Sequence, residues 1–358
     1  MKKIFILLFF LVPSISLAEK FKIGAPICLT GGCAEWGEAT KNGLTIAQES
    51  LNAKGGILGK QIEIIYEDTS EATGGFKAVT AFKKLKSYGD INFYIGPSWT
   101  PGGLALAPVV GKMKDVVMIS PSLGVAQFIE SSSNLFNTMP HSEDATRAIA
   151  RLMIQNQLKK VAIFSSQQPW EDLQAKVFRE EFIKLGGEII SEQSPNPDTT
   201  DLKTESLKIV SAKPESVFLA NLNQSGIASR QLRGLGYKGP LYAALLDQTR
   251  IDLAQGALEG AVTAQYPEAS SDFVAAYTKR FGKKPNTSAD TAHDAMIVLA
   301  MAINNAKSIS SESVIAQILK IEFQGASGLV KFDSKGGVVR TPQYVVVKNS
   351  RLEILLPS

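Results

Sequence analysis

Short apolar runs alternate with segments of helical spacing along most of this 358-residue chain, and this alternation restricts the fold more than any other feature. In the first half, the expected order is a strand at 21–27, a helix at 43–52, a strand at 61–66, a helix at 75–88 and a strand at 91–95. Strands that are separated by helices pair in parallel, and the helices cover both faces of the sheet. The sequence therefore predicts an α/β fold built on parallel sheets.

The same order returns in the second half of the chain. A strand is expected at 161–164, a helix that ends at Lys184 follows, and further strands are expected at 188–191 and 217–219. Both halves contain a helix that ends in Gly-Gly before a strand, in "NAKGGILGKQIEII" and in "IKLGGEII". A chain of this length also exceeds what one core usually covers. We therefore predict two related α/β lobes, with a single large doubly wound domain as the alternative.

A third block of elements follows these two lobes. Helices are expected at 287–305 and 311–320, and residues 329–333 and 344–347 have the pattern of a closing hairpin. Because these elements must join a lobe that is already built, the chain is expected to cross between the lobes more than once.

The first 18 residues have the layout of a secretory signal sequence. Lys2 and Lys3 form a basic start, residues 4–12 are an unbroken apolar run, and Ser16-Leu17-Ala18 offers a small-x-small cleavage site. The apolar run is too short for a membrane-spanning helix, which needs about 20 residues. A buried helix or a membrane anchor is the alternative. We expect cleavage after Ala18 and a mature protein outside the cytoplasm.

Cys28 and Cys33 are the only cysteines, and they lie close together in the sequence. In an oxidising compartment, such a pair across a turn is expected to form a disulfide, which stabilises the fold by roughly 2 kcal/mol through loop entropy. Two free buried thiols are the alternative. A metal site at this pair is disfavoured because neither a histidine nor a third cysteine stands nearby.

Charge and motifs argue against several classes of protein. Two of the 38 lysines and arginines lie in the signal segment, so against 34 acidic residues the mature chain is too weakly basic for a nucleic-acid surface. The turn in "LTGGCAEWGEATKNGL" lacks the spacing of a P-loop or a dinucleotide fingerprint. His141 and His293 are the only histidines and have no metal-ligand neighbours, and no G-x-S-x-G motif surrounds Ser98 or Ser327. A secreted hydrolase is therefore a remote alternative, and a binding function is favoured.

Five segments carry a family resemblance over essentially the whole mature chain: "IGAPICLTGGCAEWGEATKNGLTIAQESLNAKGGILGKQIEIIYED", "YIGPSWTPGGLALAPVV", "VMISPS", "SVFLANLNQSGIASRQLRGLGYKGPLY" and "ADTAHDAMIVLAMAI". Together they resemble the periplasmic leucine/isoleucine/valine-binding proteins, the receptor subunits of branched-chain amino-acid ABC importers. The resemblance implies two Rossmann-like lobes joined by a three-segment hinge, with a ligand cleft between them at the carboxyl ends of the strands. After the signal at 1–18, it implies lobe 1 at 19–140 and 264–345, and lobe 2 at 141–263 and 346–358.

The resemblance also implies ligand-binding residues in lobe 1. Trp36 occupies the position of an aromatic residue that packs on the ligand, although a Trp that caps the lobe core is the alternative. Thr100 aligns with a hydroxyl that binds the ligand's carboxylate, and Ser98 and Trp99 stand beside it. Hydroxyls at a helix N-terminus suit an anion because unsatisfied N–H donors lie there.

The next loop of lobe 1 is expected to contribute as well. Ser122 aligns with a residue whose backbone carbonyl accepts from the ligand's ammonium. Gly124 replaces a family hydroxyl, so a side-chain contact is lost while its N–H remains. Ser120 and Ser122 fit ordinary turn positions equally well.

Lobe 2 departs further from the family pattern. Trp170 stands near a family Tyr as an aromatic lid, Asn221 occupies another pocket position, and His293 replaces a family Tyr unless it is a surface or core histidine. Where amino-acid-binding relatives have a carboxylate, this chain has Leu245, with Asp247 two residues later. Since a buried ammonium without an anionic partner is costly, either Asp247 reaches the cleft or the ligand is not an α-amino acid.

We therefore expect an extracytoplasmic, periplasmic solute-binding protein that is not an enzyme. It would close around a small polar ligand, with an amino acid favoured, and deliver it to the transmembrane subunits of an ABC importer. The alternatives are a binder of a non-amino carboxylic acid, aromatic or aliphatic, and a ligand-sensing domain of a receptor. A monomer is expected, with no cofactor, metal or nucleic-acid partner.

Overall fold

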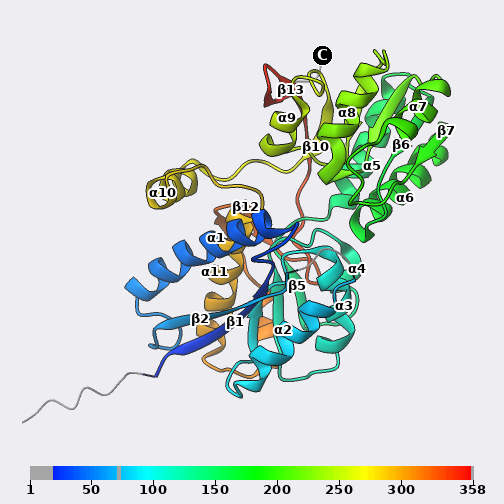
Figure 1. The fold of residues 1–358 in the computed structure, drawn as a ribbon. Coiled ribbons are helices and arrows are strands. Elements are labelled where there is room, and N and C mark those ends of the chain that lie inside the picture. Colours follow the sequence, from blue (N-terminus) through cyan, green and yellow to red (C-terminus); the bar gives the residue numbers. More distant parts are fainter. Residues whose placement is uncertain (1–18, 71–73, 356–358) are drawn as a thin grey trace, which may run out of the picture.

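Two sheets, each covered by helices, organise the chain into two lobes (Figure 1). The computed structural model describes residues 19–70 and 74–355, so the predicted signal sequence and the last three residues lie outside the described part. Two lobes with parallel-core sheets were predicted from the sequence, and this fold class is confirmed.

Lobe 1 is built on a five-stranded parallel sheet. Its strands are β1 (Phe21–Ile27), β2 (Ile62–Asp68), β3 (Phe93–Ile95), β4 (Val117–Ser120) and β5 (Leu135–Asn137), in the order β2-β1-β3-β4-β5. The helices are α1 (Ala34–Ala53), α2 (Phe76–Ser87), α3 (Thr100–Val110), α4 (Ala126–Ile129), α11 (Ala289–Ala306) and α12 (Ser311–Ile318). Each expected strand and helix of this region is present, and most ends differ by one or two residues, but α1 begins at Ala34, nine residues before the expected start at 43.

The central strands β3 and β4 of lobe 1 bury both faces. Ile95 and Ile119 pack with α1 and α11, whereas Tyr94 and Met118 pack with α2 and α3. Successive side chains of a strand point to opposite faces, so a continuous apolar run is what a sheet between two helical layers requires.

Lobe 2 is built on a seven-stranded sheet in the order β14-β13-β10-β9-β8-β6-β7. Its strands are β6 (Lys160–Phe164), β7 (Glu188–Gln193), β8 (Ser216–Leu219), β9 (Leu241–Ala243), β10 (Val262–Gln265), β13 (Gln343–Lys348) and β14 (Arg351–Ile354). The helices are α5 (Ser142–Gln155), α6 (Pro169–Lys184), α7 (Lys203–Ser211), α8 (Ser225–Gly234) and α9 (Gln248–Ala254), with the 3-10 turn η1 (Leu222–Gln224). The strands β6 to β10 are parallel, and β13 and β14 add antiparallel pairs.

The expected closing hairpin does not form. Residues 329–331 belong to β12 (Gly328–Lys331), which pairs with β11 (Glu322–Gly325), whereas β13 pairs with β10 and β14. Both segments have strand patterns, but sequence spacing alone does not determine which strand is the partner. The prediction was therefore right about the strands and wrong about their pairing.

Three segments cross between the lobes near one another (Figure 1). The first joins β5 to α5, and the second leaves β10 for the lobe 1 side, where Tyr277 of α10 (Ser271–Phe281) accepts a hydrogen bond from Asn42. The third joins β12 to β13 and contacts the end of β5, where the Asn137 N–H donates to the Gly336 carbonyl. Because β13 already begins at Gln343, the proposed lobe boundary at 345/346 falls inside a strand of the second sheet.

Candidate functional site

A cavity of about 1240 Å³ lies between the two lobes and is lined by residues of both. Its walls are formed by the loops that follow the carboxyl ends of the parallel strands, where ligands bind in open α/β sheets. We define the lobe 1 wall as Trp36, Ser98, Trp99, Thr100, Ser122 and Gly124, and the lobe 2 wall as Trp170, Glu171, Leu222, Leu245 and Asp247. In the described ranges no helix is long and apolar enough to cross a bilayer, and no group of three or more His, Cys, Asp or Glu side chains could hold a metal ion.

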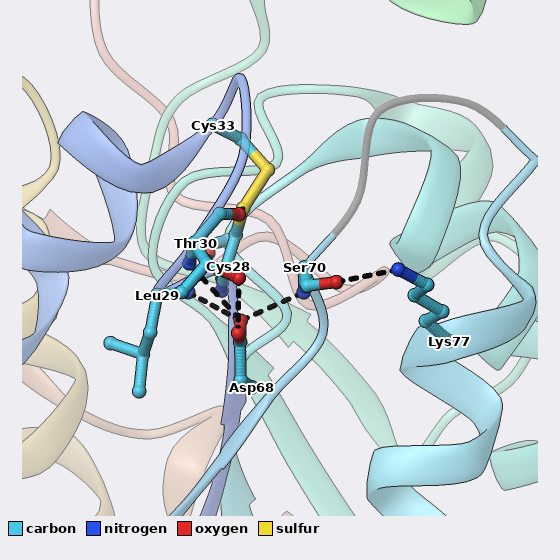
Figure 2. Close-up of a disulfide and its surroundings, with 8 residues drawn as sticks. Cys28, Leu29, Thr30, Cys33, Asp68, Ser70 and Lys77 are labelled. Carbon is cyan, nitrogen blue, oxygen red and sulfur yellow. Dashed lines mark hydrogen bonds between the residues drawn. A yellow bond between two sulfur atoms is a disulfide. The ribbon is translucent and has the colours of Figure 1, made fainter.

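The loop after β1 is held by a disulfide and by one carboxylate (Figure 2). Cys28 and Cys33 are bonded, with 5.8 Å between their Cα atoms, which confirms the predicted pair. Asp68, at the end of β2, accepts from the N–H groups of Leu29 and Thr30 and from the Thr30 hydroxyl. Burial acts to raise the pKa of Asp68, but these hydrogen bonds outweigh it and lower the pKa below its usual value. The loop therefore keeps an ionised anchor at neutral pH.

The same loop brings Trp36 to the cleft. Trp36 lies in the first turn of α1, and Gly37 allows this turn to approach β1, because a Cβ at Gly37 would lie 1.5 Å from the Cys28 carbonyl oxygen. The ring of Trp36 meets that of Trp99 edge to face, with 5.7 Å between the ring centroids. Both rings line the cleft and form one aromatic surface of lobe 1.

The loop after β3 leads into α3 at the cleft. Ser98 is used internally, because its hydroxyl accepts from the Cys28 N–H at 2.8 Å and ties two loops together. Thr100 is the first residue of α3, and no side-chain hydrogen bond caps this helix at Trp99. The first turn of a helix carries unsatisfied N–H groups and a partial positive charge, so this end of α3 suits an anion.

The loop after β4 contains one hydroxyl that is hydrogen-bonded within the protein and one that has no partner among the described residues. The Ser120 hydroxyl donates to the Pro97 carbonyl and accepts from the Leu123 N–H, and Ser120 does not line the cleft. Ser122 does line it, and its hydroxyl has no hydrogen-bond partner among the described residues. The Gly124 N–H already donates to the Ser122 carbonyl at 3.2 Å. The Ser122 side chain, rather than its carbonyl, is thus the free polar group here.

Trp170 and Glu171 stand in the first turn of α6 on the lobe 2 wall. The Trp170 indole donates to the Ser142 hydroxyl at 3.0 Å, beside the hinge. Glu171 is 3% exposed, and its Oε2 has no hydrogen-bond partner within the described part of the chain. Burial raises the pKa of Glu171 to about 8, although the backbone N–H groups of Asn223 and Leu222 act to lower it. This carboxyl group is therefore mostly protonated at pH 7 while the cleft holds no ligand.

Asp247 lines the cleft but is already paired. Its Oδ1 accepts from the Arg250 N–H at 2.9 Å as the cap of α9, and its Oδ2 accepts from Arg250 Nη1 at 3.0 Å. Burial raises the pKa of Asp247, and Arg250 acts against that rise. Arg250 also reaches Glu35 of lobe 1 at 3.0 Å, and the Thr249 hydroxyl donates to Glu35. These contacts join the two lobes across the cleft.

Asn221 is fully buried and does not line the cleft. Neither atom of its amide has a hydrogen-bond partner among the residues described. Its neighbour Leu222 lines the lobe 2 wall instead, beside Leu245. A ligand contact of Asn221 stays a prediction that the cleft geometry does not support.

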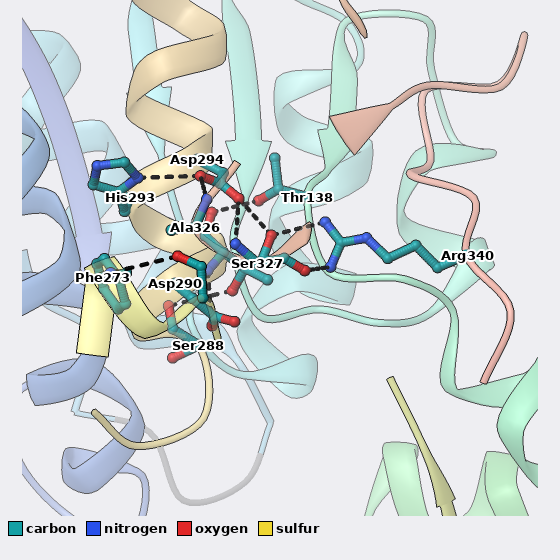
Figure 3. Close-up of polar contacts among 11 residues, drawn as sticks. Thr138, Phe273, Ser288, Asp290, His293, Asp294, Ala326, Ser327 and Arg340 are labelled. Carbon is teal, nitrogen blue, oxygen red and sulfur yellow. Dashed lines mark hydrogen bonds and ion pairs between the residues drawn. The ribbon is translucent and has the colours of Figure 1, made fainter. Parts of the chain in front are cut away.

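His293 is not among the residues that line the cleft, and Figure 3 shows it beside Phe273 and Asp294. Its ring meets that of Phe273 edge to face at 5.3 Å, and its Nδ1 lies 3.1 Å from Asp294. Asp290 lines the cleft in its place, because it lies in the first turn of α11, one turn nearer the helix end that faces the cavity. Burial raises the pKa of Asp290 to about 6. The cavity is thus lined one turn nearer the helix end than His293, and a ligand contact of His293 stays a prediction that the cleft geometry does not support.

Sequence analysis did not identify several features of the cleft. Glu171 is an acidic residue in the first turn of a helix, a position that is explained by the helix dipole without any ligand. Asp247 was predicted as a cleft residue, but its pairing with Arg250 was not, although charges three residues apart on a helix are neighbours. No sequence signal links Glu35 to Arg250, since they are brought together only by the approach of the lobes.

Comparisons with known proteins agree with this geometry. The family described as periplasmic binding protein matches residues 20–351. A curated relative, the Leu/Ile/Val-binding protein homolog 2 of Brucella abortus, is 26% identical over 89% of this chain and 87% of the relative. Another curated relative is matched over only 58% of its length.

Solved structures share the fold. One is the branched-chain amino acid transporter substrate binding protein LivJ from Streptococcus pneumoniae in complex with isoleucine, with 23% identity and a TM-score of 0.84 over 95% of this chain and all of that one. Another is a solute binding protein of an ABC transporter from R. palustris in complex with benzoate, with 19% identity and a TM-score of 0.85 over 94% of this chain and 96% of that one. At these identities the likeness concerns the fold.

Proposed function

Since this chain belongs to the periplasmic binding protein family, we propose that it captures a small organic acid in the cleft between its lobes and delivers it to an ABC importer. Members of this family bind small molecules and work with ABC transporters. The observation that carries the proposal is the cavity of about 1240 Å³ with walls from both lobes. A site divided between two lobes is closed by hinge motion, as transport requires.

The lobe 1 wall supports an acidic ligand. The unpartnered Ser122 hydroxyl and the first turn of α3 at Thr100 offer hydrogen-bond donors to a carboxylate. The rings of Trp36 and Trp99 offer an apolar surface beside these donors. A carboxylate next to an apolar group is therefore the ligand feature that this wall fits.

An α-amino acid is the ligand that we favour. The related Brucella abortus protein is named for leucine, isoleucine and valine, and the pneumococcal structure holds isoleucine. An amino acid also requires an acceptor for its ammonium, and the lobe 2 wall contains the carboxyl groups of Glu171 and Asp247.

An aromatic carboxylic acid is the second candidate. Leu245 and Leu222 make the lobe 2 wall partly apolar, and a solved structure of similar fold from R. palustris holds benzoate. Such a ligand has no ammonium, so it would leave the acidic groups of lobe 2 unused.

We propose that closure is stabilised by direct contacts between the lobes. Arg250 and Thr249 of lobe 2 bond to Glu35 of lobe 1, and the Tyr266 hydroxyl donates to the His141 carbonyl at the hinge. A ligand that touches both walls would add to these contacts and shift the population towards the closed state. In this proposal the protein only binds the ligand, so the ligand is released unchanged.

The further parts of the proposal concern compartment and partners. We propose export with cleavage after Ala18, a monomer in the periplasm, and docking to the transmembrane subunits of the importer. Mass measurement of the exported protein tests the cleavage site, and light scattering tests the monomer. A receptor-sensing role would instead show ligand binding without any effect of gene deletion on uptake.

A thermal-shift screen tests the ligand class. The probes are the twenty common amino acids, their deaminated acids and benzoate, each added to the wild-type protein. Stabilisation by one class and not the others identifies the ligand class, and intrinsic fluorescence should change because Trp36, Trp99 and Trp170 all line the cleft. The absence of stabilisation by any carboxylic or amino acid would contradict the proposed function.

A further inference from the structure

Two buried polar atoms of the cleft have no hydrogen-bond partner in the described part of the chain. They are Ser122 Oγ on the lobe 1 wall and Glu171 Oε2 on the lobe 2 wall. Buried polar groups in proteins are nearly always paired, so an unpaired one that lines a ligand cleft indicates where a ligand atom belongs. One of these atoms belongs to a hydroxyl that can donate, and the other to a carboxyl group.

The carboxyl group of Asp247 is a weaker partner for a cation. Both of its oxygens accept from Arg250, so its charge is already compensated. An ammonium at this place would also lie near the Arg250 guanidinium, which repels it. Asp247 therefore serves to cap α9 and to hold Arg250 in position.

Glu171 differs from Asp247 in its hydrogen bonding and in its lack of an ion pair among the described residues, although Arg250 acts on both carboxyl groups. It is 3% exposed, its Oε2 is unpartnered among the described residues, and no ion pair is formed by its side chain within them. The charged groups that act on it are Asp172, next in the chain, and Arg250, and the loop at Leu222 and Asn223 faces it with backbone N–H groups. A cation beside Glu171 Oε2 would meet an oxygen that has no other partner among the described residues.

We propose that Glu171 is the specificity-determining residue of lobe 2, and that it binds the ammonium group of an α-amino acid whose carboxylate lies on the lobe 1 wall at Ser122 and Thr100. This inference rests on the proposed function. It assigns to the first turn of α6 the anionic partner that is missing at Leu245.

The protonation state of Glu171 gives the inference a second readout. With a pKa of about 8, the ligand-free protein holds a proton on this carboxyl group at pH 7. An ammonium binds the ionised form, so the O–H bond of the carboxyl group breaks and the proton passes to the buffer. We expect the release of nearly one proton for each amino acid bound.

Calorimetry at pH 7 in phosphate and in Tris measures this release, because the two buffers take up protons with different enthalpies. The probe is the amino acid with the largest thermal shift, and its deaminated acid is titrated in parallel. Only the amino acid should release a proton. This measurement uses the wild-type protein and does not depend on the folding of any variant.

Glu171→Gln provides the matched test by substitution. It should weaken binding of the amino acid at least 100-fold, abolish proton release and leave binding of the deaminated acid within about threefold. Glu143→Gln is the control. Like Glu171, Glu143 is buried, has a raised pKa and has one oxygen without a partner among the described residues. Unlike Glu171, it does not line the cleft. This control should bind the amino acid as the wild type does.

The outcomes separate the inference from the proposed function. Amino-acid binding by Glu171→Gln within threefold of the wild type, or wild-type binding without proton release, overturns the inference and leaves the function standing. Wild-type binding of deaminated acids alone overturns the inference and supports a carboxylic acid without an amino group as the ligand. If no amino acid or carboxylic acid binds, both fail.

Discussion

The two walls of the cleft carry different kinds of side chain. The lobe 1 wall consists of aromatic rings, hydroxyls and a helix end, which come from the loops after β1, β3 and β4. The lobe 2 wall contains two buried carboxyl groups, and the residue that holds one of them, Arg250, also reaches across to lobe 1. The lobe 1 wall as defined above therefore carries no titratable side chain, although Asp290 and Glu35 of lobe 1 also line the cavity. The lobe 2 wall contains carboxyl groups whose charge depends on their surroundings.

This difference explains how the cleft can bind carboxylates in general and still discriminate among ligands that carry one. Neutral donors on lobe 1 suit any carboxylate, so they provide general affinity. Buried carboxyl groups on lobe 2 respond strongly to the presence or absence of a cation on the ligand, because an unpaired buried charge is costly. We therefore expect substitutions and pH to act more strongly through lobe 2 than through lobe 1.

The largest expected effect is the pH dependence that Glu171 gives to the ligand-free protein. Its pKa is 4.5 as a free group and about 8 when folded, so between these values the folded state holds a proton that the unfolded state has lost. Stability must then fall as pH rises through this window, by on the order of 4 kcal/mol for this group. Urea unfolding at pH 5 and pH 8 should show a smaller fall in Glu171→Gln than in the wild type. Equal falls in both proteins would contradict the raised pKa.

The next effect concerns the pair on the same wall. Arg250→Met leaves Asp247 buried with its main counter-charge removed, so the free energy of unfolding should fall by about 3 kcal/mol. Adding Asp247→Asn to this variant removes the uncompensated charge and should recover part of the loss. A loss below about 1 kcal/mol in the single variant, measured by urea unfolding at pH 7, would show that the pair contributes little.

In lobe 1, the disulfide should contribute a smaller amount. The double substitution of Cys28 and Cys33 by serine releases a short loop and should cost about 2 kcal/mol of stability through chain entropy. Urea unfolding of the wild type in reductant should reproduce the loss. Two thiols that react with an alkylating reagent in the native, oxidised protein would refute the bond itself.

The smallest effect is expected at a single hydroxyl of the lobe 1 wall. Ser122→Ala removes one neutral hydrogen bond to the ligand carboxylate and should raise Kd roughly fivefold, equivalent to about 1 kcal/mol. Calorimetry measures the change with the amino acid from the thermal-shift screen. Ser120→Ala is the matched control, since its hydroxyl is bonded within the loop, and it should affect stability rather than Kd. If the control weakened binding as much as Ser122→Ala, direct contact by Ser122 would be disproved.

The sequence predicted the fold and most of lobe 1 because the relevant signals are local. Apolar runs and helical spacing marked the strands and helices, and the close spacing of Cys28 and Cys33 indicated their bond. Trp36, Trp99 and Thr100 lie in the segments that directly follow β1 and β3, and parallel strands bring such segments to the same edge. Chain connectivity is enough to place groups of this kind.

Tertiary structure decided what the polar groups do. Ser120 and Ser122 look alike in the sequence, yet one hydroxyl is bonded beneath the loop and the other is free in the cleft. The pairing of β13 with β10, the contact of Arg250 with Glu35 and the burial of Glu171 depend on segments far apart in the chain or on neighbouring backbone. Periodicity and spacing report which face a residue occupies, whereas its charge and its free hydrogen-bonding capacity depend on which atoms pack around it, and that packing exists only in the folded molecule.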